Sequence, residues 1–391
     1  MSLAVQHRPV SARSFARRSS RVAPRIVATA AYKSPSSVTS ANTLQALSRM
    51  SNVVPDTLLL ESSVQPKAAT VSSLLLSWIL SNEQLGMKLY QNAIAASLNY
   101  DKCLAQKGDA RLSCQLDKAL TNVGALLSSQ IEGRVCTEVD PRLAKDKDAM
   151  LSRAQSVLSL YAEMGVPKDK LIMRVPATWA GIQAAAELEK QGIATQAFHI
   201  YSFVQGVAAA QAGISVVQPN VGRTRDWYNK NPGVIRDPNG PREDTGFSSG
   251  IDPGVRLASE LYGYIKKYHP KTQVMASGLR TANDALALAG CDYLVLTAKV
   301  MSELETTPTL QGYNSGLSAT APAEEDGIER MLSPAAAAAS ELADIGPISE
   351  AQFNDMLGPC GQDLLDQGLS GLVRDVETVL PYFKARAAGN E

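Results

Sequence analysis

Long apolar runs are missing from this sequence of 391 residues: no stretch reaches the ~18 consecutive apolar residues that a membrane-spanning helix needs. Aromatic residues are also few, at 5% of the chain, although hydrophobic residues make up 45%. A core built mainly from Val, Ile, Leu and Ala side chains favours layers of helices and strands. We therefore expect a large aliphatic core and no membrane partner.

Cysteine pairs with the spacing of a zinc site or redox motif are absent. The chain has five cysteines and no C-x-x-C pair: Cys103, Cys114, Cys136, Cys291 and Cys360. An odd number without paired spacing argues against a disulfide framework and against zinc. We expect free thiols, with Cys136 and Cys291 filling core space. A regulatory disulfide is the alternative, which no spacing motif indicates. Beyond the first 31 residues the only histidines are His199 and His269, so a histidine metal site or a Ser-His-Asp triad has little support, and we expect no metal and no cofactor.

Acidic residues are missing from the start of the chain, because the first one is Asp56. The same stretch carries six arginines among serine and alanine: Arg8, Arg13, Arg17, Arg18, Arg21 and Arg25. That composition is typical of an organelle transit peptide, which we place over residues 1–31, followed by a polar linker over 32–43. A disordered basic arm for nucleic acid is the alternative. Without those arginines, 32 basic residues face 38 acidic ones, and a net charge of −6 disfavours general nucleic-acid binding.

Strand-like segments alternate with helical periodicities from residue 44 onward. Six segments have the composition of strands: 133–140, 171–175, 194–203, 214–219, 273–279 and 292–298. Two more strand-like segments upstream begin near residues 52 and 68. Apolar strands joined by helices are typical of parallel sheets that are covered on both faces. We predict an α/β fold, a (β/α)8 TIM barrel. The alternative, an open doubly wound sheet, would have a Gly-rich phosphate loop after an early strand, which the sequence lacks.

Two polar segments rich in glycine and proline interrupt this alternation, at 229–252 and 305–327. Long loops of this kind in a compact domain are functional or disordered. After Pro347 the pattern is helical to the end of the chain. We therefore predict that residues 44–391 form a barrel domain with extra C-terminal helices that cap it.

Four segments are similar in order and spacing to the transaldolase family: "GRVCTEVDPRL", "LIMRVPATWAGIQAAAELEKQGI", "YSFVQGVAAAQAGISVV" and "VGRTRDWY". The resemblance implies a (β/α)8 barrel that moves a dihydroxyacetone unit between sugar phosphates in the pentose phosphate pathway. It also implies a Schiff base, in which a lysine amine attacks the ketose carbonyl while carboxylates shuttle protons. The amino-acid sequences of these segments are most similar to those of the plant and algal branch of the family. With "IVATAAYK", which resembles a stromal processing site, this favours the chloroplast stroma.

Four family positions are retained in this chain. Asp56 in "VVPDT" matches an acid/base aspartate, and Glu138 in "CTEVD" matches the proton-relay glutamate. Arg223 in "VGR" and Arg280 in "SGLR" match two arginines that hold the substrate phosphate. The resemblance therefore implies a sugar-phosphate ligand, with surface salt bridges as the alternative for the two arginines. The oligomeric state stays open, a homo-oligomer included.

Other family positions differ, and one of them carries the chemistry. The Schiff-base lysine corresponds to Arg174. An imine needs a free amine, whereas a guanidinium with a pKa above ~12 stays protonated. Four further polar positions of the family pattern correspond to Val71, Gln196, Phe198 and Gln218. Arg174 is then either a phosphate or carboxylate clamp, or an internal ion-pair partner of Glu138 or Asp56.

A relocated amine is the remaining route to a Schiff base. Lys299 follows the last predicted strand, on the rim where barrel enzymes place reactive groups, and the alternative is a solvated lysine. Lys67 would fall on the opposite rim. The sequence thus leaves three functions open: a transaldolase with rearranged catalysis, a non-catalytic sugar-phosphate-binding or regulatory protein, and a structural protein with a vestigial pocket. We expect very low classical transaldolase activity.

Overall fold

The computed structural model describes residues 42–56, 67–82, 85–232, 252–308 and 328–387. The chain divides into two units, 1–36 and 37–391, and the first lies outside the described residues. The predicted transit peptide and most of the predicted linker fall there, as do most of the two glycine- and proline-rich segments. These predictions therefore stay untested.

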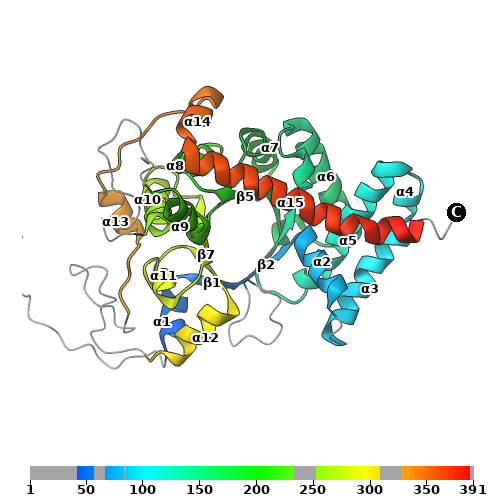
Figure 1. Cartoon of the computed structure of the whole chain (residues 1–391), viewed down its shortest axis with the longest axis horizontal. Coiled ribbons are helices and arrows are strands. Elements are labelled where there is room, and N and C mark those ends of the chain that lie inside the picture. Colours follow the sequence, from blue (N-terminus) through cyan, green and yellow to red (C-terminus); the bar gives the residue numbers. More distant parts are fainter. Residues whose placement is uncertain (1–41, 57–66, 83–84, 233–251, 309–327, 388–391) are drawn as a thin grey trace, which may run out of the picture. The chain divides into compact units, whose positions relative to one another are not determined.

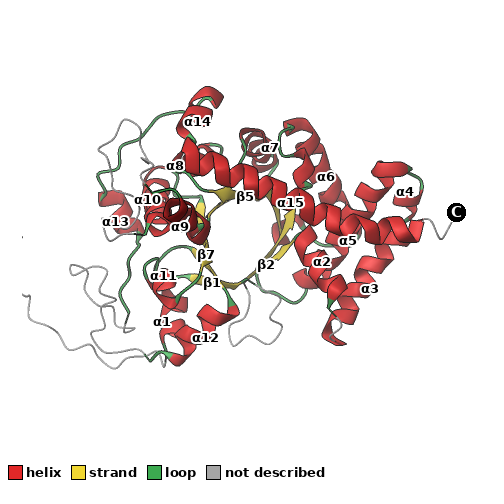
Figure 2. Ribbon diagram, viewed as in Figure 1, coloured by secondary structure: helices red, strands yellow, loops and turns green. Residues whose placement is uncertain are grey.

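A single sheet of eight parallel strands forms the centre of the described structure. The strands are β1 (Asn52–Pro55), β2 (Ala68–Val71), β3 (Arg134–Glu138), β4 (Leu171–Pro176), β5 (Thr195–Ile200), β6 (Val216–Pro219), β7 (Gln273–Leu279) and β8 (Tyr293–Leu296). They pair in the order β1-β8-β7-β6-β5-β4-β3-β2, and each ladder is parallel. Because β1 and β2 also lie next to each other, the sheet is a nearly closed ring (Figure 2). The predicted (β/α)8 barrel is confirmed.

Helices surround this ring, and several more follow the last strand (Figure 1). They are α1 (Thr43–Met50), α2 (Ser73–Ser81), α3 (Lys88–Ala96), α4 (Asp101–Leu104), α5 (Gly108–Ser128), α6 (Lys147–Glu163), α7 (Trp179–Lys190), α8 (Phe203–Gln211), α9 (Val221–Lys230), α10 (Pro253–Tyr268), α11 (Ala282–Leu286), α12 (Ala298–Thr306), α13 (Pro334–Ala339), α14 (Glu350–Met356) and α15 (Gly358–Ala387). Within the described ranges, none of these helices has the length and apolar character to cross a membrane.

Capping residues start several helices directly after the strands. Ser72, Thr178 and Asn220 each accept a hydrogen bond at the side-chain oxygen from a backbone N–H in the first turn of the helix that follows. Such caps satisfy backbone donors that a helix leaves unpaired. Thr178 also donates its hydroxyl to the carbonyl of Ala144 at 2.6 Å. The short connections at the carboxyl end of the barrel are therefore well anchored.

The barrel interior is filled in layers, because side chains along a strand alternate between inside and outside. An apolar layer inside the ring contains Val54, Cys136, Ile172, Val216, Met275 and Val295. Two residues further along β3, β4 and β6, the inward positions hold Glu138, Arg174 and Gln218. A polar layer thus lies directly on the apolar one, toward the carboxyl ends of the strands.

Helix α15 crosses the carboxyl end of the barrel (Figure 1). It contacts α2, which follows β2, and α9, which follows β6, and these two strands lie on opposite sides of the ring. Trp227 on α9 donates its indole N–H to Asp363 of α15 at 2.9 Å. Tyr201, Trp227, Cys360 and Leu364 form an apolar cluster at this contact. The predicted C-terminal helices are present, and α15 packs over the polar layer.

The expectation that all cysteines are free thiols was wrong for two of them. Cys103 and Cys114 form a disulfide, with Cα atoms 5.4 Å apart. The short helix α4 turns back onto the start of α5, which brings the two residues together although no spacing motif marks them. The prediction for Cys136 and Cys291 is confirmed, since both are buried free thiols.

Candidate functional site

Arg174 is the centre of the polar layer. Its side chain is 17% exposed, and Nη2 donates a hydrogen bond to Oε1 of Gln218 at 3.2 Å. The guanidinium carbon lies 3.7 Å from the ring centroid of Phe198, a cation–π contact. Nη1 is 4.0 Å from Oε2 of Glu138, the outer limit of an ion pair. Side chains from β3, β5 and β6 therefore hold the guanidinium in place on the inside of the barrel.

Glu138 is an almost fully buried carboxyl group, 2% exposed. Its Oε1 accepts a hydrogen bond from the backbone N–H of Ser73 at 3.3 Å, while Oε2 has no hydrogen-bond partner among the described residues. Burial raises the pKa of Glu138 to about 7, although Arg174 and the Ser73 amide both act to lower it. A carboxyl group that titrates near neutral pH suits proton transfer.

His199 lies beside Arg174 in an unusual backbone conformation, with φ of 59°. Its Nδ1 is 2.7 Å from the hydroxyl of Tyr201, whose oxygen accepts a hydrogen bond from Arg223 at 3.1 Å. Since Arg223 can only donate, the Tyr201 proton is free to bond Nδ1, which assigns the ring proton to Nε2. Burial, together with the charges of Arg174 and Arg223, lowers the pKa of His199 to about 3, so the ring is neutral. Nε2 has no partner within the described part of the chain.

Arg223, in the first turn of α9, and Arg280, directly after β7, lie at the carboxyl end of the barrel. Gly222 permits this approach, because a Cβ there would meet the Gly278 carbonyl oxygen at 2.5 Å and Nε of Arg280 at 2.8 Å. Arg280 forms two hydrogen bonds with Asp226, at 2.7 and 2.5 Å, and its side chain is 49% exposed. This hydrogen-bonded pairing lowers the pKa of Asp226. For both arginines to bind one phosphate, Arg280 would have to exchange its hydrogen bonds with Asp226 for bonds to the phosphate.

The remaining predicted residues lie in different surroundings. Gln196 is buried one layer below, where it accepts a hydrogen bond from the Cys136 thiol at 2.7 Å and donates to the Met275 sulfur at 3.1 Å. Val71 is buried at the end of β2. Asp56 follows β1 at the rim. Partial burial raises its pKa, while the charge of Arg174 lowers it.

Within the described ranges, no lysine forms a hydrogen bond or ion pair with Arg174, Glu138 or Gln218. Lys299 at the start of α12 is 78% exposed, and its amine lies 3.8 Å from Glu303. Lys67 is exposed at the amino end of β2 and donates to Asn52. Lys266, the one buried lysine among the described residues, pairs with Asp292, just before β8. Arg174, Glu138, Gln218 and Phe198 are thus brought together, whereas Lys299 faces solvent.

Two contributors to the site were missed in the sequence: Tyr201, which links His199 to Arg223, and Asp226, which occupies Arg280. Tyr201 lies near the carboxyl end of the predicted strand 194–203, and that position was the one available signal. Asp226 lies three residues beyond Arg223 on the same helix, but its partner Arg280 is far away in the sequence. No metal-binding group of three or more His, Cys, Asp or Glu side chains occurs in the part of the chain that the structure describes.

Comparison with known proteins adds evidence that is independent of this geometry. A family model described as transaldolase/fructose-6-phosphate aldolase matches residues 80–347. The chain is 37% identical to the transaldolases of Rattus norvegicus and Homo sapiens over 241 residues, which is 61% of this chain and 67% of each relative. It is 32% identical to the transaldolase of Thermosynechococcus vestitus over 354 residues, covering 89% of this chain and 82% of the relative.

Proposed function

Because this chain belongs to the transaldolase/fructose-6-phosphate aldolase family, we propose that it binds a sugar phosphate at the carboxyl end of the barrel without forming an imine at position 174. One observation carries this proposal. The inward position on β4 that corresponds to the family's lysine holds the guanidinium of Arg174, fixed by Gln218 and Phe198. A guanidinium keeps its proton at all physiological pH values and has no lone pair for attack on a ketose carbonyl.

The arginines and the unpaired polar atoms support a phosphorylated polyol as ligand. Arg223 lies in the first turn of α9 and Arg280 directly after β7, and planar guanidinium groups bind phosphate through two parallel hydrogen bonds. Oε2 of Glu138, Nε of Arg174 and Nε2 of His199 are buried and have no hydrogen-bond partner among the described residues. A buried unpaired polar atom costs about 1–3 kcal/mol, so sugar hydroxyls that bond these atoms would recover part of that cost.

A working transaldolase with a different amine is the second candidate, and family membership favours it. Glu138 still occupies the relay position, with a pKa of about 7. The amine would have to come from Lys299, which pairs with Glu303 and faces solvent. For a ketose carbonyl held near Arg174, Lys299 would have to leave that position and reach across the rim. The fixed guanidinium therefore favours the non-covalent function.

Borohydride trapping distinguishes the two functions. The purified chain is incubated with fructose 6-phosphate, reduced with sodium borohydride and analysed by peptide mass spectrometry. Thermal unfolding with and without the sugar phosphate measures binding in parallel, because a ligand that binds only the folded chain raises Tm. We expect a raised Tm and no adduct. An adduct on Lys299 would establish the transaldolase instead, and no change in either readout would leave only a structural role.

We also propose that the protein works in the chloroplast stroma, in sugar-phosphate metabolism. The arginine-rich, acid-free composition of residues 1–31 supports this location. Residues 1–43 fused to a fluorescent protein should direct it into chloroplasts of plant or algal cells. A mitochondrial or cytosolic signal would contradict the assignment.

A further inference from the structure

A second feature lies away from the barrel interior, at the corner where α4 meets α5. The disulfide between Cys103 and Cys114 joins the two helices there. Its two halves differ in access, because Cys103 is completely buried while Cys114 is only partly buried. Reagents from solvent can therefore reach this disulfide from the Cys114 side.

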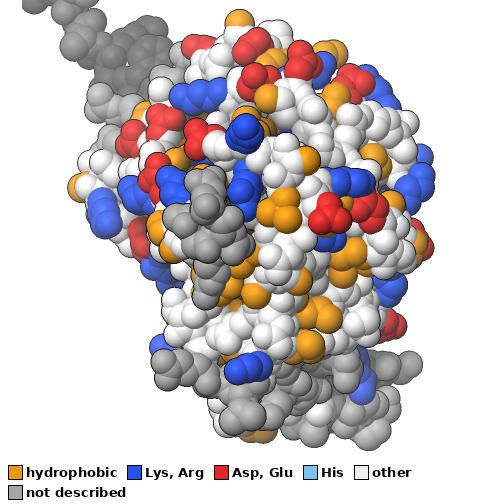
Figure 3. All heavy atoms as spheres, turned by 90° about the vertical axis from the view of Figure 1, so that its right-hand side faces the viewer, with side chains coloured by type: hydrophobic (Ala, Val, Ile, Leu, Met, Phe, Trp, Pro, Cys, Tyr) orange, Lys and Arg blue, Asp and Glu red, His pale blue; other side chains and the backbone are white. Residues whose placement is uncertain are grey.

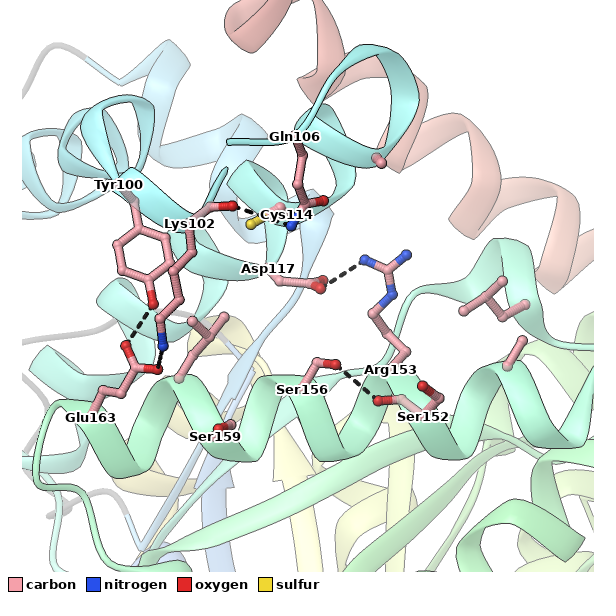
Figure 4. Close-up of a pocket in the computed structure, with 14 residues that line it drawn as sticks. Tyr100, Lys102, Gln106, Cys114, Asp117, Ser152, Arg153, Ser156, Ser159 and Glu163 are labelled. Atoms are coloured by element: carbon pink, nitrogen blue, oxygen red, sulfur yellow. Dashed lines mark hydrogen bonds and ion pairs between the residues drawn. The ribbon is translucent and has the colours of Figure 1, made fainter. Parts of the chain in front are cut away.

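A cavity of about 550 Å³ opens onto Cys114. Figure 4 shows the sulfur of Cys114 on the wall formed by α4 and α5, facing a wall on α6 that carries Ser152, Ser156 and Ser159. Polar groups thus line the side opposite the sulfur. The cavity is large enough to admit a small thiol or the exposed tip of a protein loop.

The charges around this cavity are balanced. Glu163 accepts hydrogen bonds from Tyr100 and Lys102, both at 2.5 Å. Arg153 pairs with the buried carboxylate of Asp117 at 2.8 Å. On the face of the molecule that carries α3 and α4, acidic, basic and apolar side chains are interspersed (Figure 3). The cavity lining itself carries two basic and two acidic side chains, Lys102 and Arg153 against Asp117 and Glu163, so an approaching thiolate meets no excess of negative charge among them.

We propose that the Cys103–Cys114 disulfide is a redox modification site, which a dithiol reductant attacks at the sulfur of Cys114 through this cavity. Disulfide exchange requires a thiolate to reach one sulfur in line with the bond, so access decides which sulfur is attacked. Cys114 borders the cavity, and Cys103 lies behind it in the core. This site does not depend on the proposed ligand of the barrel.

The reaction balances as a two-electron exchange. A thiolate of the dithiol bonds to Sγ of Cys114, and the Sγ–Sγ bond breaks with its electron pair leaving on Cys103, which takes up a proton. The second thiol of the reductant then attacks the mixed disulfide and releases Cys114 as a thiol. The chain gains two electrons and two protons, and the dithiol leaves oxidised as a disulfide.

Reduction should loosen this corner of the molecule. Without the disulfide, the four-residue helix α4 is held to α6 by the exposed pair of Lys102 and Glu163 and by the hydrogen bond from Tyr100. Ser113, next to Cys114, accepts a hydrogen bond from Arg142, which in turn holds Asp140, two residues beyond Glu138. Motion at the start of α5 therefore has a direct hydrogen-bonded route to the end of β3.

The first test uses the full chain, purified without reductant and kept folded. Samples are treated with dithiothreitol or with a reduced C-x-x-C dithiol protein such as thioredoxin, alkylated, and analysed by peptide mass spectrometry. We expect Cys103 and Cys114 to become alkylated at least ~10-fold faster than the buried thiols Cys136 and Cys291, which react only on unfolding. If only dithiothreitol reduces the disulfide, the reductant is a small dithiol. If both reagents reduce it, a dithiol protein also reaches the disulfide.

Two results of that test would overturn the proposal. One is the absence of a Cys103–Cys114 cross-linked peptide from the chain oxidised in air. The other is alkylation of Cys103 and Cys114 at the same rate as Cys136 with both reductants, because this would mean that the disulfide is reached only after unfolding.

Variants that each lose one cysteine of the disulfide test which sulfur is attacked. Cys103→Ser leaves Cys114, which should form a mixed disulfide with oxidised glutathione in the folded chain. Cys114→Ser leaves the buried Cys103, which should react at least ~10-fold more slowly. Equal rates would refute attack at Cys114.

The route through the cavity is tested by filling it. Ser156→Trp places a large ring on the wall opposite Cys114 and should slow reduction by the dithiol protein about fivefold. Gln155→Trp is the matched control, one residue away on α6 and outside the cavity lining, and should leave the rate unchanged. Equal rates in both variants and the native chain would refute the cavity as the path.

Discussion

The guanidinium of Arg174 contacts the ring of Phe198 on the next strand: its central carbon is 3.7 Å from the ring centroid. In the ladder between β4 and β5, Arg174 pairs with Gln196 and Phe198 pairs with Pro176, so the contact runs diagonally across two adjacent strands. The family resemblance implies a lysine nucleophile and a threonine at the positions of Arg174 and Phe198. Because the two side chains are in contact, we expect the effects of changing them to be coupled.

Arg174→Lys alone should therefore not restore transaldolase turnover. The new amine would lie against the Phe198 ring, with Val71 and Gln196 still in place of the family's asparagines. We expect less than ~1% of the turnover reached when Val71→Asn, Gln196→Asn and Phe198→Thr are added to it. The measurement is transfer from fructose 6-phosphate to an aldose phosphate. Full recovery in the single variant would contradict this coupling.

Glu138 should make the protein less stable as the pH rises toward neutral. Its folded pKa of about 7 lies above the ordinary 4.5, so the fold favours the protonated form. That contribution is complete below about pH 4.5 and is lost as the pH rises through about 7. Relative to Glu138→Gln, the native chain should lose at most on the order of 3 kcal/mol of unfolding free energy across this range.

Urea unfolding of both proteins between pH 4.5 and 8 measures this difference. Asp117 acts in the same direction, with a pKa raised to about 6 by burial, so the change between pH 6 and 7 is assigned to Glu138. Asp117→Asn provides the control for the lower range. Parallel curves for the native chain and Glu138→Gln would show that Glu138 is ionised throughout.

Two glycines of α15 should respond in opposite ways to alanine. Gly371 has open space around it, with the nearest atom of Arg374 at 3.9 Å from an added Cβ. Gly371→Ala should stabilise the chain by up to about 1 kcal/mol through helix propensity. An added Cβ at Gly368 would lie 3.1 Å from the ring of His199, which Phe198 and Tyr201 hold in place.

Gly368→Ala should therefore be less stable than Gly371→Ala by about 1–3 kcal/mol. Chemical denaturation of the two variants provides the comparison, and each serves as the other's control for helix propensity. Equal stability would mean that α15 does not press against His199.

Phosphate binding should improve when Asp226 loses its charge. Asp226 now occupies both ends of the Arg280 guanidinium, so a phosphate must displace it. Asp226→Asn should tighten phosphate binding about 3- to 10-fold, and Arg280→Leu should weaken it at least ~10-fold. Titration calorimetry with inorganic phosphate and fructose 6-phosphate measures both effects.

Glu187→Gln is the matched control for that change in charge, because Glu187 forms an exposed pair with Lys190 on the outer helix α7. It should leave the affinity unaltered. If Asp226→Asn behaved like this control, Arg280 would be a surface salt-bridge partner and not a phosphate ligand.

The barrel could be predicted because each strand carries its own apolar signature and each helix its own period. Glu138, Arg174 and Gln218 came instead from the family resemblance, and the structure places them on inward positions of their strands. Helices α3 to α5 were not anticipated, although Leu112, Leu116 and Leu120 repeat at helical spacing on α5. That signal was present in the sequence and was overlooked.

The contacts that complete the site could not be predicted from local patterns. Arg280 and Asp226 are separated by 54 residues, and Trp227 and Asp363 by 136. The Cys103–Cys114 disulfide depends on the angle between two helices, which no spacing rule describes. Pairings of this kind follow from the closed fold, so they become visible only when the strands are arranged in space.

Helix α15 also bears on how the chain folds. It follows all eight strands in the chain, yet it packs on α2, which belongs to the first part of the barrel, and on α9 from the far side. Contacts between segments so distant in sequence slow folding, because the entropy of closing the long intervening chain opposes them. During translation the barrel mouth would stay uncovered until α15 has left the ribosome, so His199 and its neighbours are buried only after every strand has been made.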